Sequence, residues 1–131
     1  AQKVFHSWPT PIVVAPWVLG RQLPYPGASI ERDFDRLGDP PHPVAFAYRL
    51  WDRMPYDRPS YDLVSVFYPP RANLGYFTET DWGRVQVDDK GYTTFESTPE
   101  GNARILSATP EQQARVLEAF VGLATQRRDT R

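Results

Sequence analysis

Residues 11–16 read Pro11-Ile12-Val13-Val14-Ala15-Pro16, and these six residues indicate the class of fold. Its four central residues are apolar, three of them are β-branched, and none alternates with a polar residue. A run of this kind is typical of a strand that is covered on both faces, as in the parallel sheets of α/β proteins. The flanking prolines end the run on both sides. We therefore expect an α/β fold in which residues 12–15 form a strand of an open, mostly parallel sheet.

The residues before this run favour a short helix. Val4, Phe5 and Trp8 have the i, i+1 and i+4 spacing of one helix face, and the prolines at positions 9 and 11 end the pattern. No Ser, Thr, Asp or Asn precedes these residues as a cap. We therefore expect the chain to begin inside a helix and to be a piece of a larger folding unit. Residues 1–8 also lack the apolar run of a secretory signal peptide, and we expect a cytoplasmic protein.

Proline and glycine divide residues 20–69 into short segments. We expect loops over residues 20–27 and 38–43, and helices over residues 28–37, 43–54 and 59–68. Proline is favoured in the first turn of a helix, which places one helix start at Pro43. The expected buried faces consist of Ile30, Phe34 and Leu37 in the first helix and of Val44, Ala47, Tyr48 and Trp51 in the second.

The last third of the chain predicts a β-hairpin and a helix. Residues 84–88 and 92–96 alternate apolar and polar side chains around Asp89-Lys90-Gly91, which is the pattern of a hairpin, and residues 104–106 favour one more short strand. Thr109, Pro110 and Gln112 then form a capping box at the start of a helix. The expected buried stripe of that helix consists of Val116, Leu117, Phe120, Val121 and Ala124.

Composition bounds the class of protein. The 131 residues suffice for one small domain, so we treat residues 1–131 as a single unit. The charge is balanced, with 15 basic and 16 acidic residues, which argues against a nucleic-acid-binding protein. No apolar run approaches the roughly 18 residues that cross a bilayer, so we expect no membrane association. The absence of cysteine excludes disulfides and thiolate nucleophiles.

Few side chains indicate chemistry on their own. The sequence has no glycine-rich phosphate loop, no G-x-S-x-G turn and no H-E-x-x-H pair. His6 and His42 are interpreted as structural or surface residues, and Asp88-Asp89 as part of the hairpin turn. Glu31 and Asp33, with Arg32 between them, form either a solvated helix face or an ion pair within the fold.

Asp62 is the carboxylate that allows a functional interpretation. It follows Arg58, Pro59 and Tyr61 at the start of an apolar helix. An acidic residue in the first turn is favoured by the helix dipole, which is sufficient to explain it. A carboxylate fixed on a rigid element is also a suitable ligand for Ca²⁺ or Mg²⁺. The residues alone leave both interpretations open, because one carboxylate does not make a metal site.

Several motifs together resemble the C-terminal half of the inosine/uridine-preferring nucleoside hydrolases, most closely a bacterial branch of that family. The resemblance covers nearly the whole chain in order. It is carried by Trp8-Pro9-Thr10-Pro11-Ile12-Val13, Gly20, Tyr25-Pro26, Ile30-Glu31-Arg32-Asp33, Pro43-Val44-Ala45-Phe46-Ala47-Tyr48, Met54-Pro55-Tyr56-Asp57-Arg58-Pro59-Ser60-Tyr61-Asp62-Leu63, Gly75-Tyr76-Phe77 and Gly83-Arg84-Val85-Gln86-Val87-Asp88.

The resemblance implies a Rossmann-like fold and the hydrolysis of the N-glycosidic bond of a ribonucleoside. In the family a tightly held Ca²⁺ binds the attacking water and the ribose hydroxyls, and Asp62 falls on the position of one calcium ligand. Tyr61 takes the place of a histidine that many members carry. The resemblance leaves two roles open for the tyrosine ring, which are stacking on the base and packing within the protein. The resemblance assigns no catalytic residue to these 131 residues.

Other parts of the family pattern are absent. The Asp-rich motif that supplies the general base and most calcium ligands has no counterpart here, nor does the Glu/Asn group that holds the ribose. Val18 stands where the related branch tends to carry a glutamate. The resemblance therefore implies a partner, the N-terminal portion of the same enzyme, as well as a homo-oligomer. The alternative is a non-catalytic binding or assembly module, which Val18 and the missing histidine favour.

Overall fold

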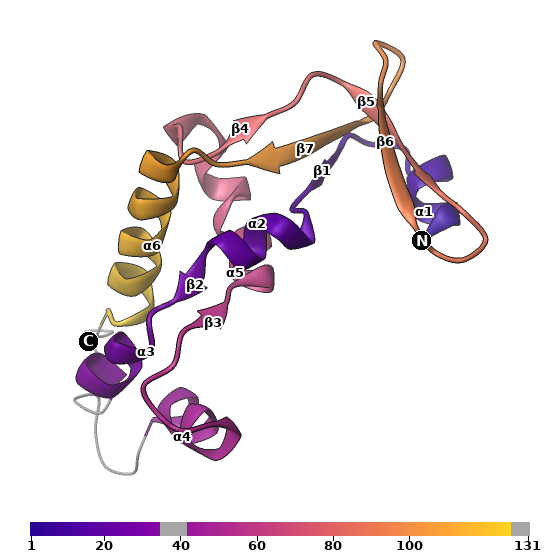
Figure 1. The fold of residues 1–131 in the computed structure, drawn as a ribbon. Coiled ribbons are helices and arrows are strands. Elements are labelled where there is room, and N and C mark those ends of the chain that lie inside the picture. The colour runs from indigo at the N-terminus through magenta and orange to yellow at the C-terminus, as the bar shows by residue number, and fades with distance from the viewer. Residues whose placement is uncertain (35–41, 127–131) are drawn as a thin grey trace, which may run out of the picture.

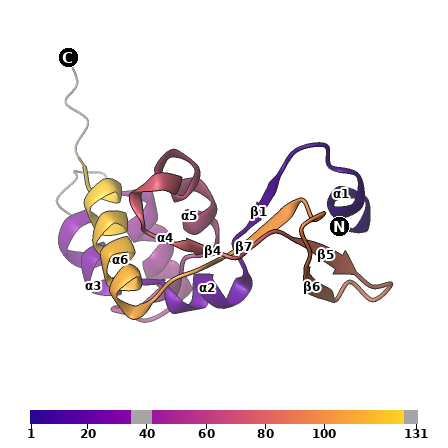
Figure 2. The same ribbon diagram turned by 90° about the horizontal axis from the view of Figure 1, so that it is seen from above.

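The computed structural model describes residues 1–34 and 42–126, which form a body of helices and a projecting arm (Figure 1). The arm lies away from the body in both views and consists of α1 (Gln2–Ser7) and the strands β5 (Gly83–Val87) and β6 (Thr93–Ser97) (Figure 2). The body consists of α2 (Trp17–Gln22), α3 (Gly27–Ser29), the π-helix η1 (Ile30–Phe34), α4 (Pro43–Trp51), α5 (Tyr61–Phe67), the 3-10 helix η3 (Pro69–Leu74) and α6 (Pro110–Ala124).

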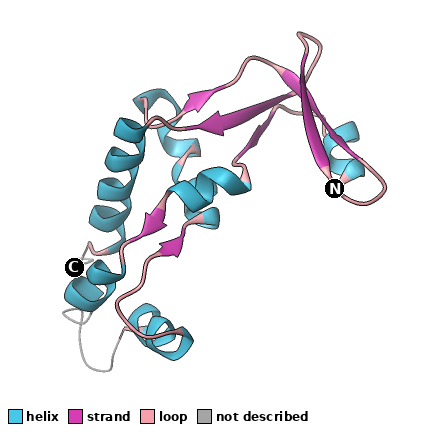
Figure 3. Ribbon diagram, in the orientation of Figure 1, coloured by secondary structure: helices cyan, strands magenta, loops and turns pink. Residues whose placement is uncertain are grey.

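A mixed sheet joins the arm to the body (Figure 3). Its strand order is β1 (Ile12–Val14), β7 (Ala103–Ser107), β5 and β6, and β4 (Thr78–Glu79) also pairs with β7. Within the described residues only β1 and β7 are parallel, and the other pairs of this sheet are antiparallel. A separate antiparallel pair joins β2 (Pro24–Tyr25) to β3 (Arg58–Pro59). The α/β class is confirmed in this coarse form, whereas the expectation of a mostly parallel sheet is wrong for the described residues.

The strand that decided the fold class is present, but its surroundings differ from those expected. β1 is parallel to β7, with Ile12 opposite Ala103, as the apolar run predicted. It is nevertheless the outermost strand, and the side chain of Val13 is 37% exposed. The prediction that this strand is covered on both faces is therefore wrong within the described residues.

The core lies in the body, between α2, α5 and α6. The ring of Phe67 on α5 contacts the ring of Phe120 on α6, with 5.2 Å between the ring centres. The buried apolar side chains of this cluster belong to Leu19, Leu23, Tyr25, Ile30, Phe34, Ala45, Val64, Phe67, Leu106, Val116 and Phe120. Many other large apolar side chains are exposed, notably Trp8, Trp17, Val18, Phe46, Leu50, Trp51 and Val66.

The elements with the strongest local signals form as predicted. The capping box at Thr109 is complete, because its side chain accepts from the Gln112 backbone and the Gln112 side chain accepts from the Thr109 backbone. The hairpin pairs Val85 with Phe95, and the Asp88 carboxylate accepts the backbone N–H groups of Lys90 and Tyr92, both at 2.8 Å. The interpretation of Asp88 as a turn residue is confirmed.

Two local predictions are corrected. Residues 20–27 are not a loop: α2 extends to Gln22 and buries Leu19, and β2 and the start of α3 follow. α4 begins at Pro43 as predicted, but it buries Ala45 and leaves Val44, Ala47 and Trp51 exposed. Of the four residues of its expected apolar face, Tyr48 packs against the core. The predicted helix over residues 28–37 is found as α3 and η1 up to Phe34, while Leu37 and residues 38–41 lie outside the described residues.

A polar cluster fixes β4 and β7 to the end of α5. The Tyr68 hydroxyl donates to Glu79 Oε1 at 2.5 Å, and Arg104 Nη1 donates to Glu79 Oε2 at 2.7 Å. The hydrogen bond from Tyr68, followed by that from Arg104, lowers the pKa of the Glu79 carboxyl. Burial and the neighbouring carboxylate raise the pKa of the Tyr68 hydroxyl to about 12.

This cluster predicts a pH dependence of stability. Because the pKa of Glu79 is lower in the folded chain, its stabilising effect is present above the carboxyl's ordinary pKa and is lost as the pH falls through the folded value. The raised pKa of Tyr68 has the opposite sign, so its effect is lost only in strongly alkaline solution. The measurement is the urea concentration at the midpoint of unfolding, determined at several acidic pH values. We expect this midpoint to fall less steeply with decreasing pH in Glu79→Gln than in the parent chain. The matched variant Glu118→Gln, on an exposed position of α6, should show the same acid dependence as the parent.

Candidate functional site

A cavity of about 830 Å³ lies at the N-terminal end of α5. It contains both residues that the resemblance singled out, Tyr61 and Asp62. Side chains from β2, η1, α4, β3 and the end of α6 complete its wall: Tyr25, Ile30, Phe34, His42, Val44, Tyr48, Arg58, Pro59, Ser60, Leu63 and Ala124. The fold therefore gathers residues from positions 25 to 124 around one opening.

The start of α5 is held by a close contact with α2. The Ser60 backbone N–H donates to the Gly20 carbonyl at 3.0 Å. A Cβ placed on Gly20 would lie 2.5 Å from Cδ1 of Tyr61, so the absent side chain makes room for the tyrosine ring. Tyr61 remains 42% exposed. Its ring therefore packs on α2 and also contributes an exposed surface to the cavity wall. It is not a fully buried packing ring.

Ser60 brings an unusual polar group to this cavity. The residue is 4% exposed, and its hydroxyl has no hydrogen-bond partner among the residues that the structure describes. It precedes α5 as the N-cap residue, yet its side chain does not cap the helix. A buried hydroxyl without a partner is unfavourable by about 1–3 kcal/mol, so Ser60 stands out as a group that a ligand or a bound water would satisfy.

Aromatic rings of Phe34, His42 and Tyr48 also line the cavity. Tyr48 and Tyr56 stack with 5.2 Å between ring centres, and the Tyr56 hydroxyl donates to the Tyr48 carbonyl at 3.0 Å. Burial raises the pKa of Tyr48, and the neighbouring Tyr56 adds to this. The ring of His42 lies edge-on to that of Phe34 at 4.8 Å. Aromatic walls of this kind favour flat, weakly polar ligands.

His42 has a structural role. Its Nδ1 accepts the backbone N–H of Val44 at 3.3 Å and so caps α4. His6 lies exposed on α1, a helix without buried residues. Both positions agree with the interpretation of the histidines as structural or surface residues.

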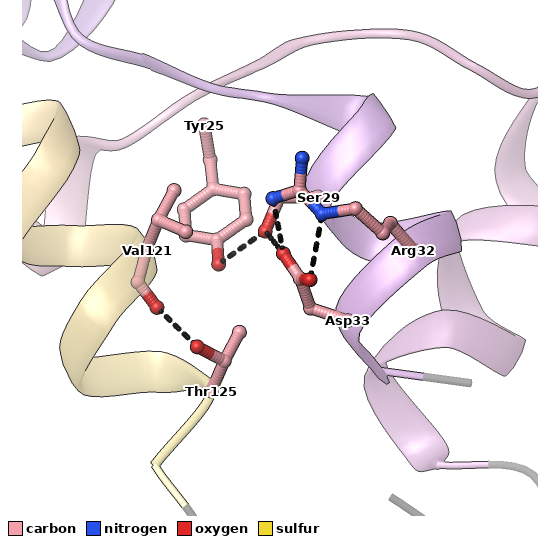
Figure 4. A network of polar contacts seen from close by, with 6 residues as sticks. All are labelled: Tyr25, Ser29, Arg32, Asp33, Val121 and Thr125. Carbon is pink, nitrogen blue, oxygen red and sulfur yellow. Dashed lines mark hydrogen bonds and ion pairs between the residues drawn. The ribbon is translucent and has the colours of Figure 1, made fainter. Parts of the chain in front are cut away.

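A chain of hydrogen bonds supports the cavity wall at Tyr25 (Figure 4). Ser29 Oγ donates to Asp33 Oδ2 at 2.8 Å, which leaves the Tyr25 hydroxyl to donate to Ser29 Oγ at 3.3 Å. Arg32 holds both oxygens of Asp33 at 2.7 Å. Burial raises the pKa of Tyr25. Each interpretation of this acidic segment fits part of it, because Arg32 and Asp33 form an ion pair while Glu31 and Arg32 are exposed. The hydrogen bonds that pass through Ser29 link Tyr25 on β2 to Asp33 on η1.

Asp62 and Val18 lie on exposed parts of neighbouring helices. Asp62 is exposed in the first turn of α5, and α2 packs beside α5. Val18, on α2, is 53% exposed. Within residues 1–34 and 42–126 no three potential metal ligands of the His, Cys, Asp and Glu types come together. Among the described residues that line the cavity, Asp62 is the one carboxylate.

A second cavity of about 810 Å³ lies between α1 and β5. Its lining includes Lys3, His6, Arg84 and Glu100. It contains neither Tyr61 nor Asp62, and every one of these four side chains is exposed. We regard the cavity at α5 as the candidate site because its wall is built from the core.

Comparison with known proteins finds no matching family model, no similar curated protein and no similar solved structure. None of the helices in the described ranges has both the length and the apolar character to cross a membrane. Sequence reasoning missed Ser60, Phe34 and Tyr48 as wall residues, because only the folded chain brings them together.

Proposed function

We propose that this chain is the C-terminal portion of a nucleoside N-ribohydrolase and that the cavity at α5 contributes to its ribonucleoside site. The observation that carries the proposal is the meeting of Tyr61, Asp62 and the unpartnered Ser60 hydroxyl in one cavity with aromatic walls. A ribonucleoside combines a flat base with a hydroxyl-rich sugar. The aromatic and polar parts of the cavity correspond to these two halves.

The proposal includes Ca²⁺ as cofactor, and the donor chemistry supports part of a calcium site. Ca²⁺ takes about six to eight oxygen ligands. Asp62 offers a carboxylate that solvent can reach, and Ser60 offers a hydroxyl nearby in the chain. The remaining ligands must come from polypeptide outside the described residues, which is the proposed N-terminal portion. When bound, such an ion lowers the pKa of a water molecule and orients the sugar.

The side chains of this portion bind and orient rather than transfer protons. Tyr61 presents a ring surface on which a base can stack. Ser60 can donate a hydrogen bond that no group within residues 1–34 and 42–126 receives. His42 uses its Nδ1 atom to accept the Val44 backbone N–H at the start of α4, so we assign it a structural role. We therefore expect that the chain alone does not hydrolyse nucleosides, either in the cytoplasm or in vitro.

The test is nucleoside cleavage by this chain assembled with the N-terminal portion. We expect Asp62→Asn to lower kcat/KM by at least 10–100-fold, because removing a direct ligand should exceed the effect of removing an outer partner. A chelator should abolish activity of the parent assembly. Asp81→Asn, an exposed carboxylate near β4, is the matched control and should retain full activity. Unchanged activity of the Asp62 variant would contradict the assignment.

The exposure of Val18 supports a second candidate function, a non-catalytic binding or assembly module. The related branch tends to carry a glutamate at this position, whereas an exposed valine offers no polar contact. Calorimetric titration of the assembly with Ca²⁺ and ribose separates the two functions. Heat with both ligands supports the hydrolase, and absence of heat with either supports the module.

A further inference from the structure

Gly20, in the last turn of α2, offers its backbone carbonyl to the start of α5. In an α-helix the carbonyl of residue 20 accepts the N–H of residue 24. Residue 24 of this chain is a proline, which has no N–H. The Gly20 carbonyl accepts the Ser60 backbone N–H at 3.0 Å. The sequence after α2 therefore leaves a backbone acceptor for Ser60.

The same glycine also meets the backbone on the other side of Ser60. A Cβ built on Gly20 would lie 2.9 Å from the Cα of Tyr61, which is closer than the roughly 3.5–4.0 Å of an ordinary carbon contact. The φ and ψ rotations of Ser60 lie between its own N–H and the Cα of Tyr61. Because Gly20 contacts the backbone at both of these points, it restrains the conformation of Ser60.

The restrained conformation keeps the Ser60 side chain from capping its helix. A capping residue is typically in the β region, where its side-chain oxygen accepts the N–H of the second or third helical residue. Thr109 shows this arrangement before α6, with a ψ of 164° and a bond from the Gln112 N–H. Ser60 has a ψ of 57°, and its side chain forms no cap bond. The contact with Gly20 therefore accounts for a buried hydroxyl that α5 does not use.

We propose that Gly20 is a positioning residue of the candidate site, because its contacts prevent Ser60 from capping α5. The hydroxyl then stays available at the cavity wall, beside Tyr61 and Asp62, to donate a hydrogen bond to a sugar hydroxyl of the ligand. The sugar contact rests on the proposed nucleoside function, whereas the restraint of Ser60 does not depend on it.

A double-substitution cycle tests the restraint on this chain without any ligand. Ser60→Ala removes a buried hydroxyl without a partner in the described ranges, so the urea midpoint of unfolding should stay the same or rise. In Gly20→Ala the added Cβ pushes the Tyr61 backbone away, and Ser60 becomes able to cap α5. Ser60→Ala should lower the midpoint in that background, because it removes the cap. In the matched background Gly122→Ala, whose Cβ has no neighbour within 4 Å, Ser60→Ala should act as in the parent.

Ribose binding by the chain assembled with the N-terminal portion tests the role of the hydroxyl. Ribose is the probe because it lacks the base on which Tyr61 stacks, so a displaced ring does not affect the result. We expect Ser60→Ala and Gly20→Ala each to weaken the calorimetric affinity about three- to tenfold, which is the loss of one uncharged hydrogen bond. The double variant should stay within about twofold of Ser60→Ala, because both changes act through the same hydroxyl.

Two checks separate positioning from a general defect. An unfolded fraction lowers the stoichiometry of ribose binding, whereas a mispositioned hydroxyl lowers the affinity at full stoichiometry. Ser65→Ala, on an exposed position of α5, is the matched control and should leave the affinity for ribose unchanged.

Each contrary result overturns a stated part of the proposal. If Ser60→Ala lowers the urea midpoint equally in the parent and in Gly20→Ala, Gly20 does not restrain Ser60. Ribose affinity that Ser60→Ala leaves unchanged excludes the sugar contact, and weaker assembly with the N-terminal portion would then assign the hydroxyl to that polypeptide. A parent assembly that neither binds ribose nor cleaves uridine overturns the nucleoside function, while the urea midpoints still decide the restraint of Ser60.

Discussion

Replacing Phe67 by alanine is expected to lower the free energy of unfolding by about 3–5 kcal/mol. Phe67 is buried at the C-terminal end of α5, where its ring meets three other rings edge-on. The ring centres of Tyr76, Phe120 and Phe77 lie 4.9, 5.2 and 6.2 Å away. Edge-to-face pairs stabilise beyond the area they bury. Truncation to alanine removes all three contacts and leaves a cavity between α5 and α6.

The measurement is urea unfolding followed by circular dichroism. Val66→Ala is the matched control, because Val66 precedes Phe67 on the same helix and is exposed. We expect that variant to stay within about 0.5 kcal/mol of the parent. A Phe67→Ala change below about 1 kcal/mol would show that α5 and α6 do not pack as described. The prediction also concerns the site, because α5 carries Tyr61 and Asp62 at its other end.

The elements that the sequence predicts well are those whose signals lie within a few residues. The start of α6 depends on Thr109 and Gln112, three residues apart, and the hairpin turn depends on the Asp88 carboxylate and two amides next to it. Such contacts form without help from distant parts of the chain. For this reason their bounds follow closely from the sequence.

The elements that the sequence misses depend on distant contacts. α2 passes through Gly20, which reads as a loop residue, but the helix is favoured here because Gly20 accommodates Tyr61 from 41 positions later. The pairing of β1 with β7 joins Ile12 to Ala103, and no local pattern specifies that the neighbouring strands β5 and β4 are antiparallel. The mixed character of the sheet was therefore not predictable from the apolar run.

The candidate site also contains some residues that the sequence singled out and others that only the folded chain reveals. Tyr61 and Asp62 were singled out through the resemblance, and the structure brings both into one cavity. Whether Asp62 binds calcium and Tyr61 binds a base stays a prediction. The unpartnered Ser60 hydroxyl had no signal in the sequence, because a serine before a helix is ordinarily a capping residue. Its burial results from the packing of α5 against α2.

Gly27→Ala is the second substitution with a large expected effect, because Gly27 lies in close contact with residues 56–57, which precede β3. Its backbone N–H donates to Asp57 Oδ1 at 2.9 Å. A Cβ at this position would lie 2.2 Å from the Tyr56 carbonyl oxygen and 2.6 Å from the Tyr56 nitrogen. These are backbone atoms, so the clash cannot be relieved by a side-chain rotation. The start of α3 must move away from Tyr56 and Asp57.

We expect this variant to lose about 3 kcal/mol of stability, from overpacking and from the weakened hydrogen bond to a carboxylate. Gly122→Ala is the matched control: its added Cβ has no neighbour within 4 Å, and alanine is favoured in a helix such as α6, so stability should rise by up to about 1 kcal/mol. Opposite shifts of the two urea midpoints would support the close approach at Gly27. Equal shifts would mean that α3 and residues 56–57 are not in contact. The described structure of the cavity wall from Tyr25 to Arg58 would then be wrong.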